Sequence, residues 1–166
     1  MNIYGWHQLE KINNFLQKKI PGVFISTTPD RNKLLVKEGS FSFVTVSSIQ
    51  MCGSLFIDDI MRFPANSEVA NRLLTAIKLF CRLCGYTQLL CYYSKQENEP
   101  SIYKFLQKNQ FQDLEIIKNR RTGNTVHLMS FVFPEEQEPE SCWLEYFEDN
   151  FKNQLFLLNK EIPNAI

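Results

Sequence analysis

The residues of this sequence that could carry out chemistry are few and scattered. Cys81 and Cys84 form a CxxC pair inside a stretch of strong helical periodicity, and the two histidines are His7 and His127. A zinc site needs about four ligands, and neither histidine follows the cysteines at ligand spacing. We therefore expect no metal site and interpret both cysteines as small apolar residues of the core.

Two adjacent carboxylates, Asp58 and Asp59, lie in the predicted strand SLFIDDIMRF. Because successive side chains of a strand point to opposite faces, one carboxylate faces each side of the sheet. An inward aspartate with a raised pKa would indicate a functional site. The alternative interpretation is a solvent-facing pair, or an ion-pair partner for Arg62. His127 falls on an aromatic strand face, where a lone histidine is usually packed and hydrogen-bonded.

The stretch PANSEVANRLL, residues 64–74, leads from that strand into a predicted helix and contains no glycine. The helix is expected from Ser67 to Cys84, because apolar residues recur along one face and Gly85 suits its C-terminus. Asn66 or Ser67 can cap its first turn. A carboxylate at Glu68 is favourable beside the positive end of the helix dipole. This turn is therefore suited to starting a helix.

Composition limits the class of protein. The 166 residues are 44% hydrophobic, which suits one domain with a proper core. Eighteen basic and eighteen acidic residues cancel, so overall charge indicates neither nucleic-acid nor membrane binding. The N-terminus has no secretion pattern, and no segment approaches the roughly 20 apolar residues of a membrane span. With five irregularly spaced cysteines that fit reduced thiols, we expect a soluble cytoplasmic protein.

The order of elements predicts an α/β (α+β) fold, a mixed and mostly antiparallel sheet of six or seven strands flanked by helices. A helix over 5–19 ends at Pro21 and Gly22. The closely spaced strand runs that follow are typical of an antiparallel meander: GVFISTT, NKLLVKE, SFSFVTVSSI and SLFIDDIMRF. The long helix and QLLCYYS complete a right-handed βαβ unit, so its two strands should be parallel. A short amphipathic helix and a hairpin turning at Gly123 complete the sheet.

The composition changes after residue 133. Residues 134–140 form an acidic spacer rich in proline and glutamate, following a domain over 1–133 whose core spans 22–133. Residues 141–159 predict an amphipathic helix, which packs on its own domain or forms a partner surface in a homodimer or with another protein. Its apolar stripe is Trp143, Phe147, Phe151, Leu155 and Leu158.

The order of elements from 33 to 133 resembles the GCN5-related N-acetyltransferases, the GNAT superfamily. LFIDDIMRFP is similar to the fourth strand of that family and its proline. VANRLLTAIKLFCRLCGYTQLLCYY is similar to its long helix and fifth strand, and SIYKFLQKNQF to its LYEKLGF segment. The resemblance covers about six tenths of the chain and implies a GNAT-like sheet.

The resemblance also implies a coenzyme site, which this sequence alters. Family members hold the pyrophosphate of acetyl-CoA in a turn of the form Arg/Gln-x-x-Gly-x-Gly/Ala directly before the long helix. Aligned on Leu73 and Leu74, that turn corresponds to residues 65–70, where only Ala70 agrees. Glu68 replaces the first glycine and repels a diphosphate. No cofactor is therefore expected.

The catalytic groups that the resemblance implies are altered as well. The tyrosine that acts as general acid in the family corresponds to Leu106, and Tyr103, nearly one turn earlier, is the candidate for that role. The alternative interpretation of Tyr103 is an ordinary half-buried aromatic residue with its hydroxyl at the surface. The family often draws a general base from its fourth strand, which makes Asp58 and Asp59 the candidates here.

Two functions therefore remain open. The first is a non-catalytic binding or regulatory module on a GNAT scaffold, which acts through protein–protein contacts of the C-terminal stripe. The second is a divergent acetyl-CoA-dependent N-acyltransferase with an aspartate base. In that alternative, the coenzyme lies against the end of the fourth strand and the start of the long helix, at Ile60, Met61, Arg62, Ser67, Val69 and Ala70.

Overall fold

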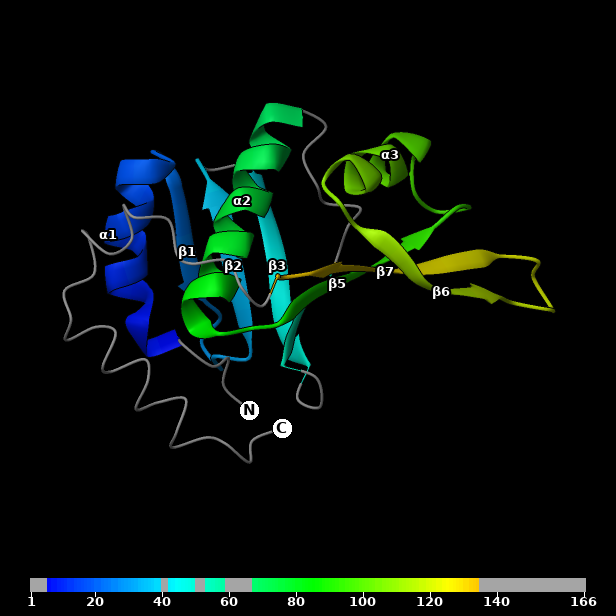
Figure 1. Cartoon of the computed structure of the whole chain (residues 1–166), viewed down its shortest axis with the longest axis horizontal. Coiled ribbons are helices and arrows are strands. Elements are labelled where there is room, and N and C mark those ends of the chain that lie inside the picture. Colours follow the sequence, from blue (N-terminus) through cyan, green and yellow to red (C-terminus); the bar gives the residue numbers. More distant parts are fainter. Residues whose placement is uncertain (1–5, 40–41, 50–52, 59–66, 135–166) are drawn as a thin grey trace.

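Seven strands form one mixed sheet in the computed structural model, which describes residues 6–39, 42–49, 53–58 and 67–134 (Figure 1). The sheet order is β1-β2-β3-β4-β5-β7-β6. Neighbouring strands are antiparallel except β4 and β5, which are parallel. The predicted mixed sheet is confirmed. Its strands are β1 Val23–Thr27, β2 Lys33–Glu38, β3 Ser42–Ile49, β4 Ser54–Ile57, β5 Gln88–Ser94, β6 Gln112–Lys118 and β7 Thr125–Val132.

The helices begin and end close to the predicted positions. A short 3-10 helix, Trp6–Gln8, leads into α1, Leu9–Lys19, before the first strand. The crossover between β4 and β5 is α2, Ser67–Cys84, which ends where Gly85 adopts a positive φ of 79°. The short helix α3, Pro100–Lys108, has proline in its first turn, where the missing N–H is not needed.

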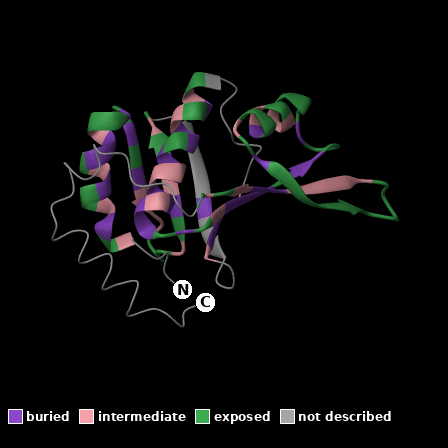
Figure 2. Ribbon diagram, in the orientation of Figure 1, coloured by how far each residue is buried: buried purple, intermediate pink, exposed green. Residues whose placement is uncertain are grey.

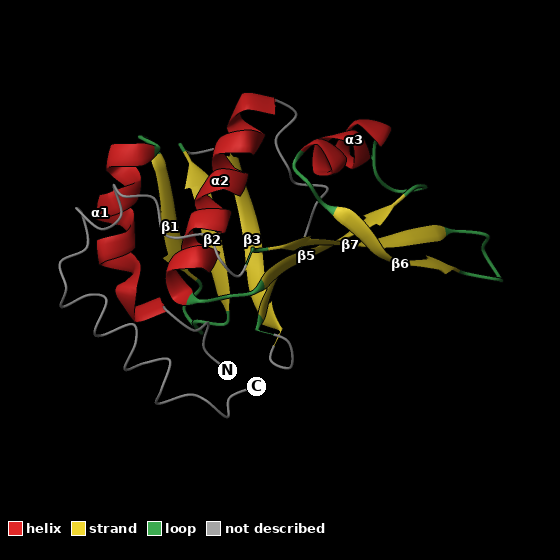
Figure 3. Cartoon of the chain, viewed as in Figure 1, coloured by secondary structure: helices red, strands yellow, loops and turns green. Residues whose placement is uncertain are grey.

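The α-helices of the described chain pack on one face of the sheet (Figure 3). Leu89 and Tyr93 point to the same side of β5 because they are an even number of residues apart. Lys78 of α2 lies 3.9 Å from the ring centroid of Phe131, the register neighbour of Leu89. Tyr103 of α3 packs against Tyr93, with ring centroids 5.0 Å apart. Buried side chains of α1 belong to the same core, so we call this the helical face.

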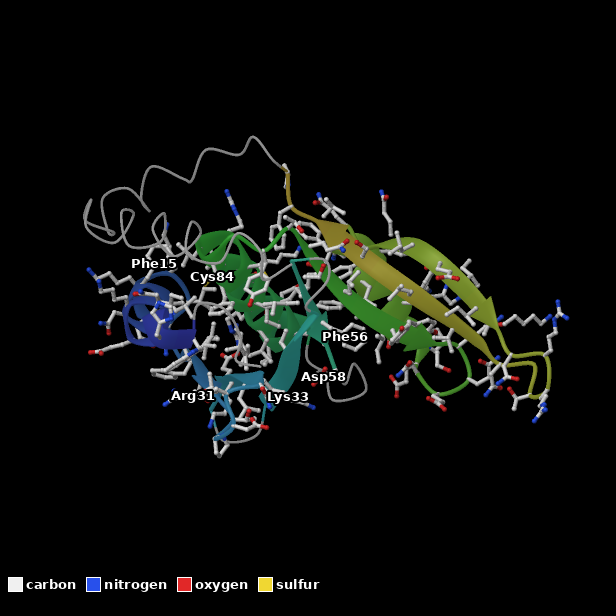
Figure 4. All side chains as sticks on the ribbon, turned by 90° about the horizontal axis from the view of Figure 1, so that it is seen from below. Phe15, Arg31, Lys33, Phe56, Asp58 and Cys84 are labelled. Carbon is white, nitrogen blue, oxygen red and sulfur yellow. The ribbon has the colours of Figure 1, made fainter. Side chains whose placement is uncertain are left out.

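The opposite face, which we call the open face, carries no helix within the described ranges. Strand alternation assigns Phe24, Leu35, Phe56 and Tyr92 to it. Phe24 is 51% exposed and Tyr92 47%. In Figure 4, Phe56 lies on the other side of the sheet from the buried core. Within the described ranges, the sheet therefore has one face covered by helices and one face without them.

Two predictions about segments are only partly covered by the structure. The predicted strand SLFIDDIMRF is observed as β4 and a bend at Asp58, and residues 59–66 lie outside the described ranges. The predicted helix over 141–159 and all but the first residue of the spacer also lie outside them. None of the described helices has the length and apolar character that a membrane span requires.

Candidate functional site

Strand β5 extends beyond the carboxyl end of its parallel neighbour β4. They pair from Ser54 opposite Gln88 to Ile57 opposite Cys91, and β5 then continues to Ser94, where its partner among the described strands is β7. In open α/β sheets, ligands bind at the carboxyl ends of parallel strands, where neighbours diverge. The carboxyl ends of β4 and β5 are therefore the candidate position for a site.

Asp58, the candidate base, follows β4 directly and is engaged in an ion pair. Its carboxylate lies 2.9 Å from the Lys33 Nζ, and the two side chains are 19% and 50% exposed. Lys33 alternates with the buried Leu34, so the pair lies on the open face. Figure 4 labels both residues. The hydrogen bond and charge of Asp58 raise the pKa of Lys33 above its ordinary value. Asp58 thus forms an ion pair, as the alternative interpretation expected, and its partner in the described ranges is Lys33. Arg62 lies outside those ranges.

Other candidates at this position fall partly outside the described ranges. Asp59 and the predicted coenzyme contacts Ile60, Met61 and Arg62 lie in the undescribed segment. Ser67 is the first residue of α2. The side chain of Val69 is partly buried against the core, and that of Ala70 is 3% exposed. The side chain of Ala70 therefore belongs to the core, and that of Val69 is partly accessible.

The first two turns of α2 have little positive charge to offer an anion. Glu68 is acidic and exposed in the first turn. Arg72, the first basic residue of the helix, is held by Glu38 at the end of β2 through Nε at 2.9 and 3.1 Å and through a terminal guanidinium nitrogen at 2.8 Å. This bond raises the pKa of Arg72. A helix N-terminus attracts anions, but the charged side chains of the first two turns of α2 are a carboxylate and a guanidinium that Glu38 neutralises.

Tyr103, the candidate acid, belongs to a second cluster on the helical face. Its hydroxyl donates a hydrogen bond to Oδ2 of Asp113 at 2.7 Å, and Nδ1 of His127 lies 3.0 Å from Oδ1 of the same carboxylate. The rings of Tyr93, Tyr103 and His127 pack together at 5.0 to 5.8 Å. The hydrogen bond to Asp113, with a smaller contribution from burial, raises the pKa of Tyr103. The predicted packed and hydrogen-bonded His127 is confirmed.

Asp113 is the residue that sequence reasoning missed. It bridges α3 and β7, because one carboxylate can accept from two donors at once. The sequence did contain an indication that Asp113 and His127 could be close, since they lie on the two strands of the predicted hairpin. Their pairing depends on a register shift between Asp113 and Glu115 in β6, however, which alternation alone does not show.

The structure does not bring Asp58 and Tyr103, the two described catalytic candidates, together. Asp58 is bound on the open face, and Tyr103 is bound on the helical face, each by a partner from its own side. A general acid and a general base for one acyl transfer must both reach the reacting atoms within hydrogen-bonding distance. In this conformation both groups are committed to other contacts.

The cysteines of α2 belong to the core. Cys81 and Cys84 are 0% and 1% exposed, and burial raises the pKa of both thiols. Cys91 of β5 is equally buried, with its pKa raised to about 12. Among the residues that the structure describes, no group of three or more His, Cys, Asp and Glu side chains is arranged to hold a metal ion.

The architecture matches solved acetyltransferases. A proposed GNAT-family acetyltransferase from Desulfovibrio desulfuricans aligns over 72% of this chain and 76% of its own, with a TM-score of 0.52 and 13% identity. The chain has the GNAT fold. The aminoglycoside 6'-N-acetyltransferase from Enterococcus faecium aligns over 79% and 94%, with a TM-score of 0.52 and 8% identity.

A third structure contains the coenzyme. A proposed streptothricin acetyltransferase from Bacillus anthracis, solved with acetyl coenzyme A, aligns over 62% of this chain and 64% of its own, with a TM-score of 0.52 and 13% identity. The sequence matches no protein-family model and no curated protein. Structural similarity at such low sequence identity shows a shared fold and does not show a shared reaction. The chemistry of this chain must therefore be argued from its own residues.

Proposed function

We propose that this chain is a binding or regulatory module on a GNAT scaffold and does not catalyse acyl transfer. The observation that carries the proposal is that both described catalytic candidates are held by other residues: Asp58 is paired with Lys33, and Tyr103 donates a hydrogen bond to Asp113. A base must be able to accept a proton from the substrate and an acid must be able to give one up. The Asp58 carboxylate is engaged by the Lys33 ammonium, and the raised pKa of Tyr103 disfavours release of its proton.

The charges at the start of α2 support the absence of a coenzyme. A diphosphate there would meet the carboxylate of Glu68, and Arg72 would have to leave Glu38 to contact it. Charge-assisted hydrogen bonds are worth about 1.5 to 3 kcal/mol each, so losing several of them removes most of the affinity for a coenzyme. We expect a dissociation constant for acetyl-CoA no tighter than about 1 mM.

The proposed module acts through protein contacts of its C-terminal segment. Burying a large apolar side chain is worth about 1.5 to 3 kcal/mol, so the stripe of residues 141–159 favours a covered position. Part of the stripe packs on the domain, and its aromatic end contacts a partner protein or a second copy. The residues proposed for that contact are Trp143, Phe147, Phe151 and Leu155.

A second candidate function is a divergent acetyl-CoA-dependent N-acyltransferase. The parallel pairing of β4 and β5, which ends at Ile57 and Cys91 in the described ranges, favours it, because open α/β sheets bind ligands at the carboxyl ends of parallel strands. In this alternative Asp58 or Asp59 is the base and Tyr103 the acid. Asp58 would first have to leave Lys33, and Tyr103 would first have to leave Asp113.

Calorimetric titration with acetyl-CoA separates the two candidates. The full chain is titrated into the millimolar range, with the Bacillus anthracis protein as positive control because it was solved with that coenzyme. We expect no saturable heat from this chain. Micromolar binding would overturn the proposal, and a Glu68→Gly variant that binds more tightly still would assign the coenzyme to the start of α2.

A further inference from the structure

The two edges of the sheet are completed in different ways. The sheet order places β1 at one edge and β6 at the other. An edge strand presents unpaired backbone N–H and C=O groups. At β1, the Asn13 carboxamide of α1 bonds both backbone groups of Ile25, and Nε2 of Gln17 donates to the Val23 carbonyl at 2.7 Å. Side chains of α1 thus occupy the free edge of β1.

The edge formed by β6 has no such cover in the described part of the chain. Gln112–Lys118 pairs with β7 along one side, and all seven of its residues are exposed (Figure 2). Three of the exposed side chains are large and apolar: Leu114 at 61%, Ile116 at 56% and Ile117 at 44%. An edge strand with exposed aliphatic side chains is a surface for pairing with another strand.

The regular part of this edge is short and well defined. A register shift lies between Asp113 and Glu115, and from Glu115 to Lys118 the strand pairs with β7 one residue to one. Ile116 and Ile117 are the middle of that regular run. A strand that adds to this edge would therefore meet two exposed isoleucines at its centre.

The order of charges indicates which strand fits. Acidic residues, Asp113 and Glu115, come first, and the basic residues Lys118, Arg120 and Arg121 follow. A second β6 in antiparallel orientation brings the acidic half of one copy opposite the basic half of the other. A parallel copy would place like charges side by side, which is destabilising.

We propose that β6 pairs antiparallel with β6 of a second copy of this chain and joins the two sheets into one. This interface is separate from the C-terminal stripe and does not depend on the proposed function. One added strand pair is a small contact, and interfaces below about 1,200 Å² are typically weak. The dimer is therefore expected to form in the range of roughly 10 to 100 µM.

Sedimentation velocity tests the surface with matched lysine variants. Ile117→Lys places a charge on the proposed interface and is expected to weaken the dimer by about tenfold or more. Phe24→Lys is the control, because Phe24 is equally exposed on the opposite edge strand. Equal weakening by both variants, or a wild-type protein that stays monomeric to about 300 µM, overturns the proposal.

Deletion of residues 134–166 distinguishes the two surfaces of the chain. If β6 forms the interface, the truncated protein still dimerises and remains sensitive to Ile117→Lys. If truncation alone abolishes the dimer while Ile117→Lys has no effect, the contact belongs to the C-terminal segment and the β6 proposal is wrong. Circular dichroism of each variant verifies that it is folded.

Disulfide trapping tests the orientation in a Cys52→Ser, Cys142→Ser background. Antiparallel pairing brings Ile117 of both copies near the two-fold axis, so Ile117→Cys is expected to cross-link on mild oxidation. Gln112→Cys should not, because ten residue steps separate the two copies of that position by about 30 Å. Efficient cross-linking at both positions would show parallel pairing and refute the antiparallel arrangement.

Discussion

The Asn13 side chain on α1 replaces a neighbouring strand for Ile25 on β1. Its Oδ1 accepts the Ile25 N–H at 2.8 Å and its Nδ2 donates to the Ile25 carbonyl at 2.7 Å. This is the bonding that a further strand would supply to an edge residue. The contact also fixes α1 against the sheet, since it lies between the buried Ile12 and Phe15 of the same helix.

Replacing Asn13 with alanine should therefore destabilise the fold. Two partly buried backbone groups of Ile25 lose their partner, and we expect the free energy of unfolding to fall by about 1 to 3 kcal/mol. Urea unfolding measures the change. The matched control is Asn14→Ala, one residue along on the exposed side of α1. If both variants lose the same stability, the bridge to Ile25 contributes nothing.

Much of the sheet and its helices could be predicted from periodicity. The helix over 67–84 is observed as Ser67–Cys84, because its apolar spacing and Gly85 define both the buried face and the end. The parallel pairing of β4 with β5 follows from the handedness of a crossover of that length. These features depend on local sequence and on rules of chain connection.

The contacts that decide the chemistry could not be predicted in this way. Asp58 pairs with Lys33 across β3, which lies between β2 and β4 in the sheet. The contact forms because both side chains are on the same face. Tyr103, Asp113 and His127 meet because α3 lies over the closing hairpin and β6 is shifted in register. Periodicity assigns a residue to a face, whereas these pairs depend on how separate elements are placed across that face.

The ion pair between Asp58 and Lys33 should contribute little to stability. Half of the Lys33 side chain is exposed, and exposed ion pairs are typically worth less than about 1 kcal/mol. A double-mutant cycle of Asp58→Asn and Lys33→Met is expected to give a coupling energy within that limit. Because Asp58 raises the pKa of Lys33, any contribution is present below the ordinary lysine pKa and is lost as the pH rises through the raised value.

A coupling energy above about 2 kcal/mol would contradict the prediction that solvent screens this ion pair. The same variants also bear on function. If Asp58 is not a catalytic base, Asp58→Asn and the wild type should be indistinguishable in an acetyl-CoA hydrolysis and transfer assay, with neither releasing free coenzyme A above background.

The hydrogen bond between Tyr103 and Asp113 should make stability depend on alkaline pH. Asp113 raises the pKa of Tyr103 above the unfolded value of about 10. The contribution is therefore fully present below pH 10 and is lost as the pH rises through the folded-state pKa. Tyr103→Phe should remove this alkaline loss, and Asp113→Asn should lower the pKa of Tyr103.

Tyrosinate absorbance measured against pH gives the pKa directly. The chain has six tyrosines, so the titration of Tyr103 is obtained by subtracting the curve of Tyr103→Phe from that of the wild type. His127→Gln is a useful comparison, since it removes the second donor to Asp113 and leaves Tyr103 in place. An unchanged titration in Asp113→Asn would rule out the carboxylate as the cause of the raised pKa.

The buried cysteines should be inert in the folded protein. Burial raises the pKa of Cys91 to about 12 and raises that of Cys81 and Cys84 as well, and only the thiolate reacts with disulfide reagents. In a Cys52→Ser, Cys142→Ser variant, Ellman's reagent at pH 8 should therefore find no reactive thiol in the native state. In denaturant, the same protein should react at all three remaining cysteines. A native thiol that reacts within seconds would contradict core packing of the CxxC pair and would reopen a redox role for α2.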